Sequence, residues 1–203
     1  TLAEVLITLG IIGVVAAITL PIVVKKYNEH VLVNLLKRDY SLFYQVTKQA
    51  DWEFQADWEN TRVVDLYNYF ISNIKTVRAC PKTSGCFESA PLNYLKSSSA
   101  GNWNNWSRYK FVMQTGEFVM ISPGDRIIEN CFGDNKPKLY LFVDINGLKK
   151  PNRIGRDVFV FGIRNGELVP SGKDTDSINC NLKKSQSGYD CAAKVLKEGK
   201  FTY

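Results

Sequence analysis

The stretch VLITLGIIGVVAAITLPIVV, residues 5–24, decides how this chain is built. It contains no charged side chain. As an α-helix that rises about 1.5 Å per residue, it would extend about 30 Å, which is the thickness of the hydrocarbon core of a bilayer. The sequence therefore predicts two parts, an apolar helical segment over residues 1–24 and a globular head over residues 25–203.

The composition of the whole chain limits the functions that the head can have. The chain has 203 residues, of which 45% are hydrophobic and 23% charged, and its formal net charge is +6. His30 is the single histidine, which excludes sites built from several histidines. The sequence shows no nucleophile–base pair and no phosphate-binding loop. We therefore expect neither an enzyme nor a resident cofactor.

Two features distinguish the apolar segment from an ordinary membrane anchor. Glu4 places a carboxylate at its start, which costs about 2.5–3.5 kcal/mol in hydrocarbon unless the charge finds a partner. Gly10, Gly13 and Pro21 interrupt the apolar run and lower helix stability, and Pro21 also lacks an amide donor. The segment is predicted to be helical in lipid and able to unwind locally elsewhere.

The sequence TLAEVLITLGIIGVVAAITLP, residues 1–21, resembles the N-terminus of the class III-signal proteins, which are the type IV pilins and the pseudopilins of type II secretion. In that family a prepilin peptidase cleaves after a glycine and methylates the new N-terminal residue, usually a phenylalanine. A glutamate then stands at the fifth position. Glu4 matches it if an N-methylated phenylalanine precedes Thr1, and with the same offset Gly13 and Pro21 match the family's helix-breaking residues.

The resemblance implies a structural protein, the major subunit of a type IV pilus or a related bacterial surface filament that serves adhesion, motility or aggregation. The subunit would wait in the inner membrane until the pilus assembly machinery adds it to a helical filament of identical subunits. Glu4 would attract the terminal amine of the next subunit, because both charges lie in an apolar bundle. The resemblance thus assigns assembly to Thr1, Glu4, Gly13 and Pro21.

Two alternatives within the family stay open. One is a type II secretion pseudopilin, which forms a short periplasmic piston. The other is a minor or competence pilin that binds DNA, for which phosphate attraction to a basic head would be needed. The basic residues are scattered and form no cluster, so DNA is the less expected partner.

The hydrophobic pattern after residue 24 predicts an α+β head of the pilin type. Apolar residues at three- and four-residue steps continue the first helix to about Trp52, with one buried face formed by Leu32, Leu35, Leu36, Tyr40, Phe43, Val46 and Ala50. A second helix is predicted over residues 61–77 and a loop over residues 80–107. Strands are then predicted at 109–114, 117–122, 138–145, 157–163 and 166–170, followed by a short helix near 191–196. A long helix followed by antiparallel strands makes an α+β arrangement.

The five cysteines all lie in the head, and on a cell surface they would be oxidised. The pairs Cys80–Cys86 and Cys180–Cys191 are close in sequence, and each would contribute about 2–3 kcal/mol by closing a short loop. The second pair resembles the disulfide-bounded C-terminal loop of many pilins. Cys131 is then left over. Zinc is not expected, since no C-x-x-C spacing occurs.

The segment VDINGLKKPNRIGRD, residues 143–157, is the best candidate for a ligand site. Asp144, Asn146 and Asp157 are oxygen donors around a glycine turn, and calcium prefers such ligands. Some pseudopilins hold calcium in a loop of the head. The segment also carries four basic residues that repel a cation, so the main interpretation is a structured loop in which Asp157 pairs with an arginine.

Trp103, Trp106 and Tyr109 lie together in a polar stretch. Aromatic side chains so placed can stack on bases or sugars. The main interpretation is that they cover the edge of the core or a contact between subunits.

Overall fold

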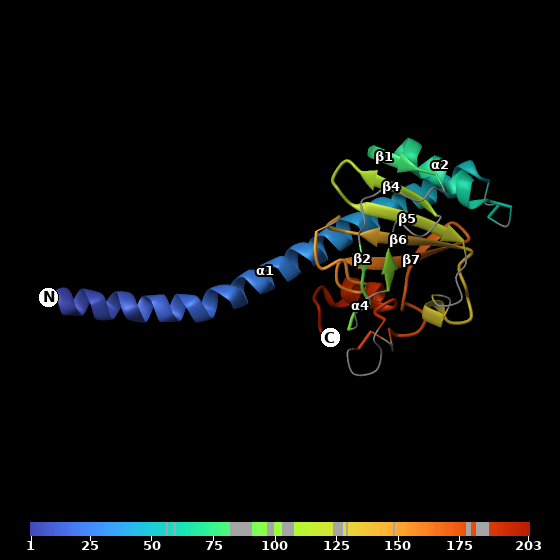
Figure 1. Cartoon of the computed structure of the whole chain (residues 1–203). Helices are drawn as coiled ribbons and strands as arrows, with labels where there is room; N and C mark the ends of the chain where they lie inside the picture. Colours follow the sequence, from blue (N-terminus) through green and yellow to red (C-terminus); the bar gives the residue numbers. More distant parts are fainter. Residues whose placement is uncertain are drawn as a thin grey trace.

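The head and the long helix are seen in a computed structural model that describes residues 1–55, 57–58, 60–81, 91–96, 100–102, 108–123, 128, 130–147, 149–177, 180–181 and 187–203. Figure 1 shows a helical rod that projects from an α+β head. The predicted fold class is confirmed. Cys86, Trp103 and Trp106 lie outside the described residues.

Helix α1 (Leu2–Glu53) has two halves with different environments. Its first half stands clear of the head (Figure 1). The apolar side chains of this half are exposed on all sides of the helix. Its second half packs on the head through the predicted face, of which Leu36, Phe43, Val46 and Ala50 are buried. The face is centred slightly differently from the prediction, since Asp39 and Thr47 are buried while Tyr40 is only partly so.

The described part of the head contains two further helices, one turn of 3-10 helix and two sheets. The helices are α2 (Val63–Asn73) and α4 (Cys191–Glu198), and the 3-10 turn is η2 (Asn130–Phe132). The main sheet has the order β1-β4-β5-β6-β7-β8, with every neighbouring pair antiparallel. Its strands are β1 (Thr76–Cys80), β4 (Tyr109–Met113), β5 (Phe118–Pro123), β6 (Leu139–Asp144), β7 (Val158–Arg164) and β8 (Glu167–Pro170). A second sheet pairs β2 (Pro91–Leu92) with β3 (Gly101–Asn102).

The prediction of one helix over residues 61–77 is wrong at its C-terminal end. Helix α2 ends at Asn73, and Ile74 is already extended, with φ −116° and ψ 134°. The chain then forms β1, in which Arg78 pairs with Val112 of β4. β-branched Thr76 and Val77 suit a strand, and pairing with β4 satisfies backbone groups there. Helical spacing cannot reveal this switch, because Val77 also fits the apolar face of a helix.

The main sheet is the middle layer of three. Alternate residues of β6, including Leu141 and Val143, face a core shared with α1, α2 and α4. The residues between them, Tyr140 and Phe142, face a second core that includes Phe132 of η2. Because both faces are covered, every residue of β6 is buried. This explains why strand β6 shows a continuous apolar run rather than strict alternation.

Candidate functional site

The exposed half of α1 is the most unusual surface of the molecule. Its large hydrophobic side chains between Leu2 and Val24 are 49–82% exposed, and none of the hydrophobic residues in this half belongs to a core of the described head. A helix that is apolar all round is stable in lipid or among other apolar helices, not in water. Its length and composition suffice to cross a membrane. The chain therefore carries a helix that can serve as a membrane anchor.

Glu4 lies at the free end of this helix, together with Thr1. The backbone N–H of Glu4 donates to Oγ1 of Thr1 over 3.4 Å, and the backbone nitrogen of Thr1 lies 2.5 Å from Oε2 of Glu4. These two contacts form a capping box. The sequence signal for it is Thr-x-x-Glu at the start of the apolar run, which sequence reasoning overlooked. In the single chain, the Glu4 carboxylate thus holds a backbone nitrogen at the helix start.

Gly13 and Pro21 both lie inside α1, which continues through them without a break. A methyl group added at Gly10 or Gly13 would meet nothing within 4 Å. Neither glycine is therefore required by packing within this chain. What remains is a lower helix stability at these positions, since glycine costs about 1 kcal/mol relative to alanine. Local unwinding of this stretch stays a prediction.

The loop that joins β6 to β7, residues 145–157, is built around the buried side chain of Asp157. Its carboxylate accepts the backbone N–H groups of Asn152 over 2.8 Å and of Arg153 over 2.5 Å. The guanidinium of Arg153 donates instead to the carbonyl of Leu95 over 2.8 Å. The expected ion pair between Asp157 and an arginine side chain is therefore replaced by contacts with backbone amides, which a sequence pattern cannot distinguish.

The three candidate calcium ligands do come together in the fold. Asp144 Oδ1 accepts the backbone N–H of Asn146 over 3.4 Å, and with its amide turned to donate, the Asn146 nitrogen lies 2.8 Å from the same oxygen. Burial, together with the charge of Asp157, raises the pKa of Asp144 well above its usual range. Burial also raises the pKa of Asp157 to about 6, although backbone N–H groups partly offset it.

The residue types of the three candidate ligands favour a cation, but the existing hydrogen bonds of Asp157 do not. Two carboxylates and an amide are hard oxygen donors, but the oxygens of Asp157 are already occupied by N–H groups. Within the ranges given above, no group of three or more His, Cys, Asp or Glu side chains is placed to hold a metal ion. Calcium at Asp144, Asn146 and Asp157 stays a prediction.

Arg156 ties the same loop to α1 and to the C-terminus. Its Nη2 donates to Oε1 of Glu29 over 2.5 Å, and its guanidinium lies 4.7 Å from the ring centre of Phe201. The hydroxyl of Tyr203 donates to the carbonyl of Gly155. The loop at the base of the head is thus fixed to α1 just beyond its exposed half.

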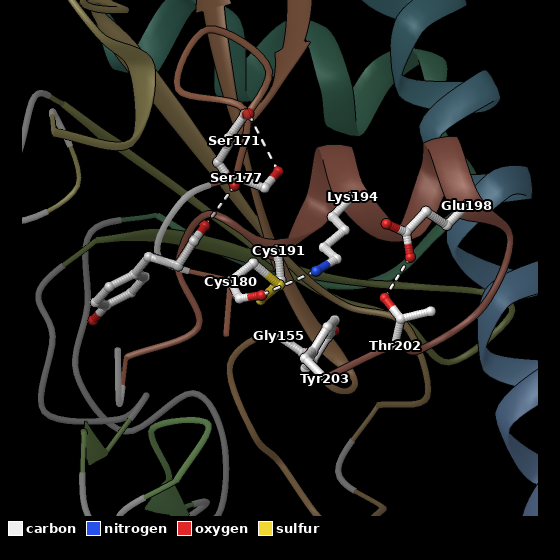
Figure 2. The surroundings of a disulfide bond; sticks show 11 residues. Gly155, Ser171, Ser177, Cys180, Cys191, Lys194, Glu198, Thr202 and Tyr203 are labelled. Atoms are coloured by element: carbon white, nitrogen blue, oxygen red, sulfur yellow. Dashed lines mark hydrogen bonds between the residues drawn. A yellow bond between two sulfur atoms is a disulfide. The ribbon is translucent and has the colours of Figure 1, made fainter. Parts of the chain in front are cut away.

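The disulfide Cys180–Cys191 closes the C-terminal region, as expected, with the two α carbons 4.8 Å apart. Figure 2 shows Lys194 reaching the carbonyl of Cys180, over 3.4 Å, and Tyr203 beside Gly155. Both cysteines are fully buried, and Cys191 is the first residue of α4. The bridge therefore anchors α4 against the loop that precedes it.

The bonding states of Cys80 and Cys131 agree with the pairing predicted from the sequence. Cys80 is disulfide-bonded. Its expected partner, Cys86, lies outside the described residues, so this pairing stays a prediction. Cys131 is a free, buried thiol in η2.

Tyr109, the described member of the proposed aromatic platform, lies in β4 and packs against Tyr67 of α2, with ring centres 5.1 Å apart. It contributes to the packing of α2 on the sheet. For Tyr109 this agrees with the interpretation that the aromatic residues cover a core edge; for Trp103 and Trp106 it stays a prediction.

Comparison of the chain with protein-family models, with curated proteins and with solved structures finds no match. A functional assignment therefore depends on the N-terminal residues and on the geometry described above.

Proposed function

We propose that this chain is a subunit of a type IV pilus or a closely related bacterial surface filament, assembled through the exposed half of α1. The observation that carries the proposal is the pairing of an unburied apolar helix with a folded head (Figure 1). The exposed half from Val5 to Val24 corresponds to about 30 Å of helix, enough to cross a bilayer. Assembly would move this helix from lipid into a bundle of identical helices.

Glu4 supports assembly rather than simple anchoring. A carboxylate at the start of an apolar helix is costly in lipid or in a dry bundle, and a cationic or N–H partner relieves that cost. In the single chain Glu4 already holds the backbone nitrogen of Thr1. In a filament the terminal amine of the neighbouring subunit would supply the same kind of partner.

The head is then the part displayed on the filament surface. Its packing on α1 leaves the apolar half free, so neighbouring helices can pack without unfolding the head. The disulfide-closed C-terminal region suits an oxidising, extracellular setting. A pseudopilin would share all of these features, and filament length distinguishes the two.

The test is negative-stain electron microscopy of material sheared from cells that produce this chain, with mass spectrometry of its N-terminal peptide. The proposal expects micrometre-long filaments of this chain that begin with a methylated residue before Thr1. A chain confined to the envelope without surface filaments would favour the pseudopilin. Monomers that never assemble in a host with pilus machinery would overturn both.

A further inference from the structure

A cleft of about 670 Å³ lies where the exposed half of α1 meets the head. One wall comes from α1, between Pro21 and Leu35, and the other from the β6–β7 loop, between Asn146 and Arg156. The cleft therefore sits at the base of the head, next to the part of α1 that can lie in a membrane.

The α1 wall of this cleft is largely apolar. Pro21, Val24, Val31, Leu32 and Leu35 line it. Pro21 and Val24 also belong to the exposed apolar run, so the apolar surface continues from the cleft along the rod. Lys25, Asn28 and Glu29 interrupt the apolar lining between Val24 and Val31. An acyl chain would therefore lie along Pro21, Val24 and the exposed apolar run, on the membrane side of Lys25.

The rim of the cleft is basic. Lys25, Lys149, Lys150 and Arg156 line it, against the single carboxylate of Glu29. Glu29 is paired with Arg156 over 2.5 Å. Within the described part of the chain, no carboxylate pairs with Lys25, Lys149 or Lys150. Three exposed ammonium groups, from two separate segments, thus remain available to an anion.

The two basic segments are held in place by contacts already described. Arg156 fastens the loop to α1, and the backbone bonds to Asp157 fix the turn at Asn152 and Arg153. Lys149 and Lys150 are therefore presented near Lys25 by a structured loop rather than by a free tail. The loop backbone would therefore lose little conformational entropy when an anion binds, and the remaining entropic cost is the ordering of the three lysine side chains.

We propose that this cleft binds the phosphate headgroup of an anionic phospholipid, with Lys25, Lys149 and Lys150 around the phosphate and the acyl chains along α1. The combination of a basic rim and an apolar wall matches the two parts of a phospholipid. The position of the cleft relative to the bilayer also agrees with a bound headgroup. About 30 Å of apolar helix ends at Val24, which places Lys25 at the headgroup layer when α1 spans the membrane. The head would rest on the bilayer in a fixed orientation before assembly. The inference depends on the proposed function only in that α1 inserts into a membrane.

Native mass spectrometry of the full chain tests this inference. The chain is released from micelles that contain equal amounts of phosphatidylglycerol and phosphatidylcholine, and the retained lipids are counted. A lysine beside an anionic membrane surface strengthens binding by about fivefold. We therefore expect at least about fivefold preferential retention of phosphatidylglycerol by the unaltered chain, and a preference at least about fivefold smaller for the triple variant Lys25→Gln/Lys149→Gln/Lys150→Gln.

The matched control removes the same charge from three exposed lysines elsewhere, Lys48→Gln/Lys173→Gln/Lys197→Gln. It should keep the preference of the unaltered chain. Equal retention of the two lipids by the unaltered chain, or an unchanged preference in the cleft variant, would overturn the inference. Thermal unfolding of both variants verifies that the head remains folded.

A second arm separates a lipid from a small anion. Addition of millimolar glycerol phosphate should leave the retained lipid in place, because the acyl chains contribute to binding. Complete displacement would show a general phosphate site and overturn the lipid assignment. Neither arm requires a filament, so a lipid preference without filaments would refute only the proposed function, and filaments without a preference would refute only this inference.

Discussion

Lowering the pH from 7.5 to 5 should stabilise the head, in contrast to the usual acid destabilisation of proteins. Burial raises the pKa of Asp157 from its ordinary 3.8 to about 6, and it raises the pKa of Asp39 to about 6 as well, although Arg38 lies beside Asp39. The pKa of Asp144 is shifted in the same direction by burial and by Asp157. All three folded carboxyls therefore hold their protons more tightly than they would in the unfolded chain.

The sign follows from proton linkage. Because the folded pKa exceeds the unfolded pKa, the favourable contribution is complete below about pH 4 and is lost as the pH rises through about 6. For a carboxyl that shifts from 3.8 to about 6, the step from pH 7.5 to 5 recovers about 1.4 kcal/mol. Asp157 and Asp39 together should raise the unfolding free energy by about 3 kcal/mol between pH 7.5 and 5. For a head of this size, that corresponds to an increase of about 6–12 °C in the thermal midpoint. Asp65 has a lowered pKa because of Arg62, but this pair is exposed and weakly coupled to stability.

The assay is thermal unfolding of the full chain in a non-ionic detergent with EDTA, followed by tryptophan fluorescence. Trp58 is buried in the head and reports its unfolding. Asp157→Asn should reduce the dependence of the midpoint on pH by about half, whatever its effect on the midpoint itself. The matched control Asp174→Asn alters a partly exposed aspartate that pairs with Arg164, and it should leave the dependence unchanged. A midpoint that falls between pH 7.5 and 5 would refute the reasoning.

Three further predictions concern the disulfide, the two halves of α1 and calcium. The variant Cys180→Ser/Cys191→Ser should lose about 3 kcal/mol of unfolding free energy, which is the value for opening a loop of this length. Denaturant titration measures this loss, and a loss below about 1 kcal/mol would contradict the prediction. Leu36→Ala should lower the unfolding free energy of the head by about 2–5 kcal/mol, because Leu36 is fully buried. Ile12→Ala, in the exposed half of α1, should change it by less than about 0.5 kcal/mol. Equal losses in the same denaturant titration would show that the two halves of α1 are not independent. If the β6–β7 loop binds calcium, millimolar Ca²⁺ should raise the thermal midpoint at pH 7.5 and have less effect at pH 5, where the carboxyls are protonated; equal midpoints with Ca²⁺ and with EDTA at pH 7.5 would exclude the site.

The sequence predicted those elements whose hydrophobic pattern has a single interpretation. Strands β4, β5, β6 and β7 lie within a residue or two of their predicted bounds, because alternating or continuous β-branched and aromatic runs end at clear turn residues. Strand β1 was missed, since its five residues follow α2 without a break in helical spacing. Only pairing with β4 decides that segment, and pairing is a property of the tertiary fold.

The candidate site shows the same limit. The apolar run and Glu4 are evident in the sequence because hydropathy is a local property. The role of Asp157 was predicted only in part, since a carboxylate that binds backbone amides looks the same in sequence as one that binds an arginine. The cleft between Lys25 and the β6–β7 loop joins residues more than a hundred positions apart, and no local pattern connects them.

The most direct test of the central claim asks whether assembly buries the exposed half of α1. A cysteine is introduced by Val14→Cys, with Lys197→Cys on α4 as the exposed control, and sheared filaments are treated with a water-soluble maleimide. Cys180 and Cys191 form a disulfide and the thiol of Cys131 is buried, so maleimide labels these native cysteines only weakly. The account predicts filaments in which Val14→Cys is protected and Lys197→Cys is labelled. Filaments labelled equally in both variants would contradict assembly through the apolar helix.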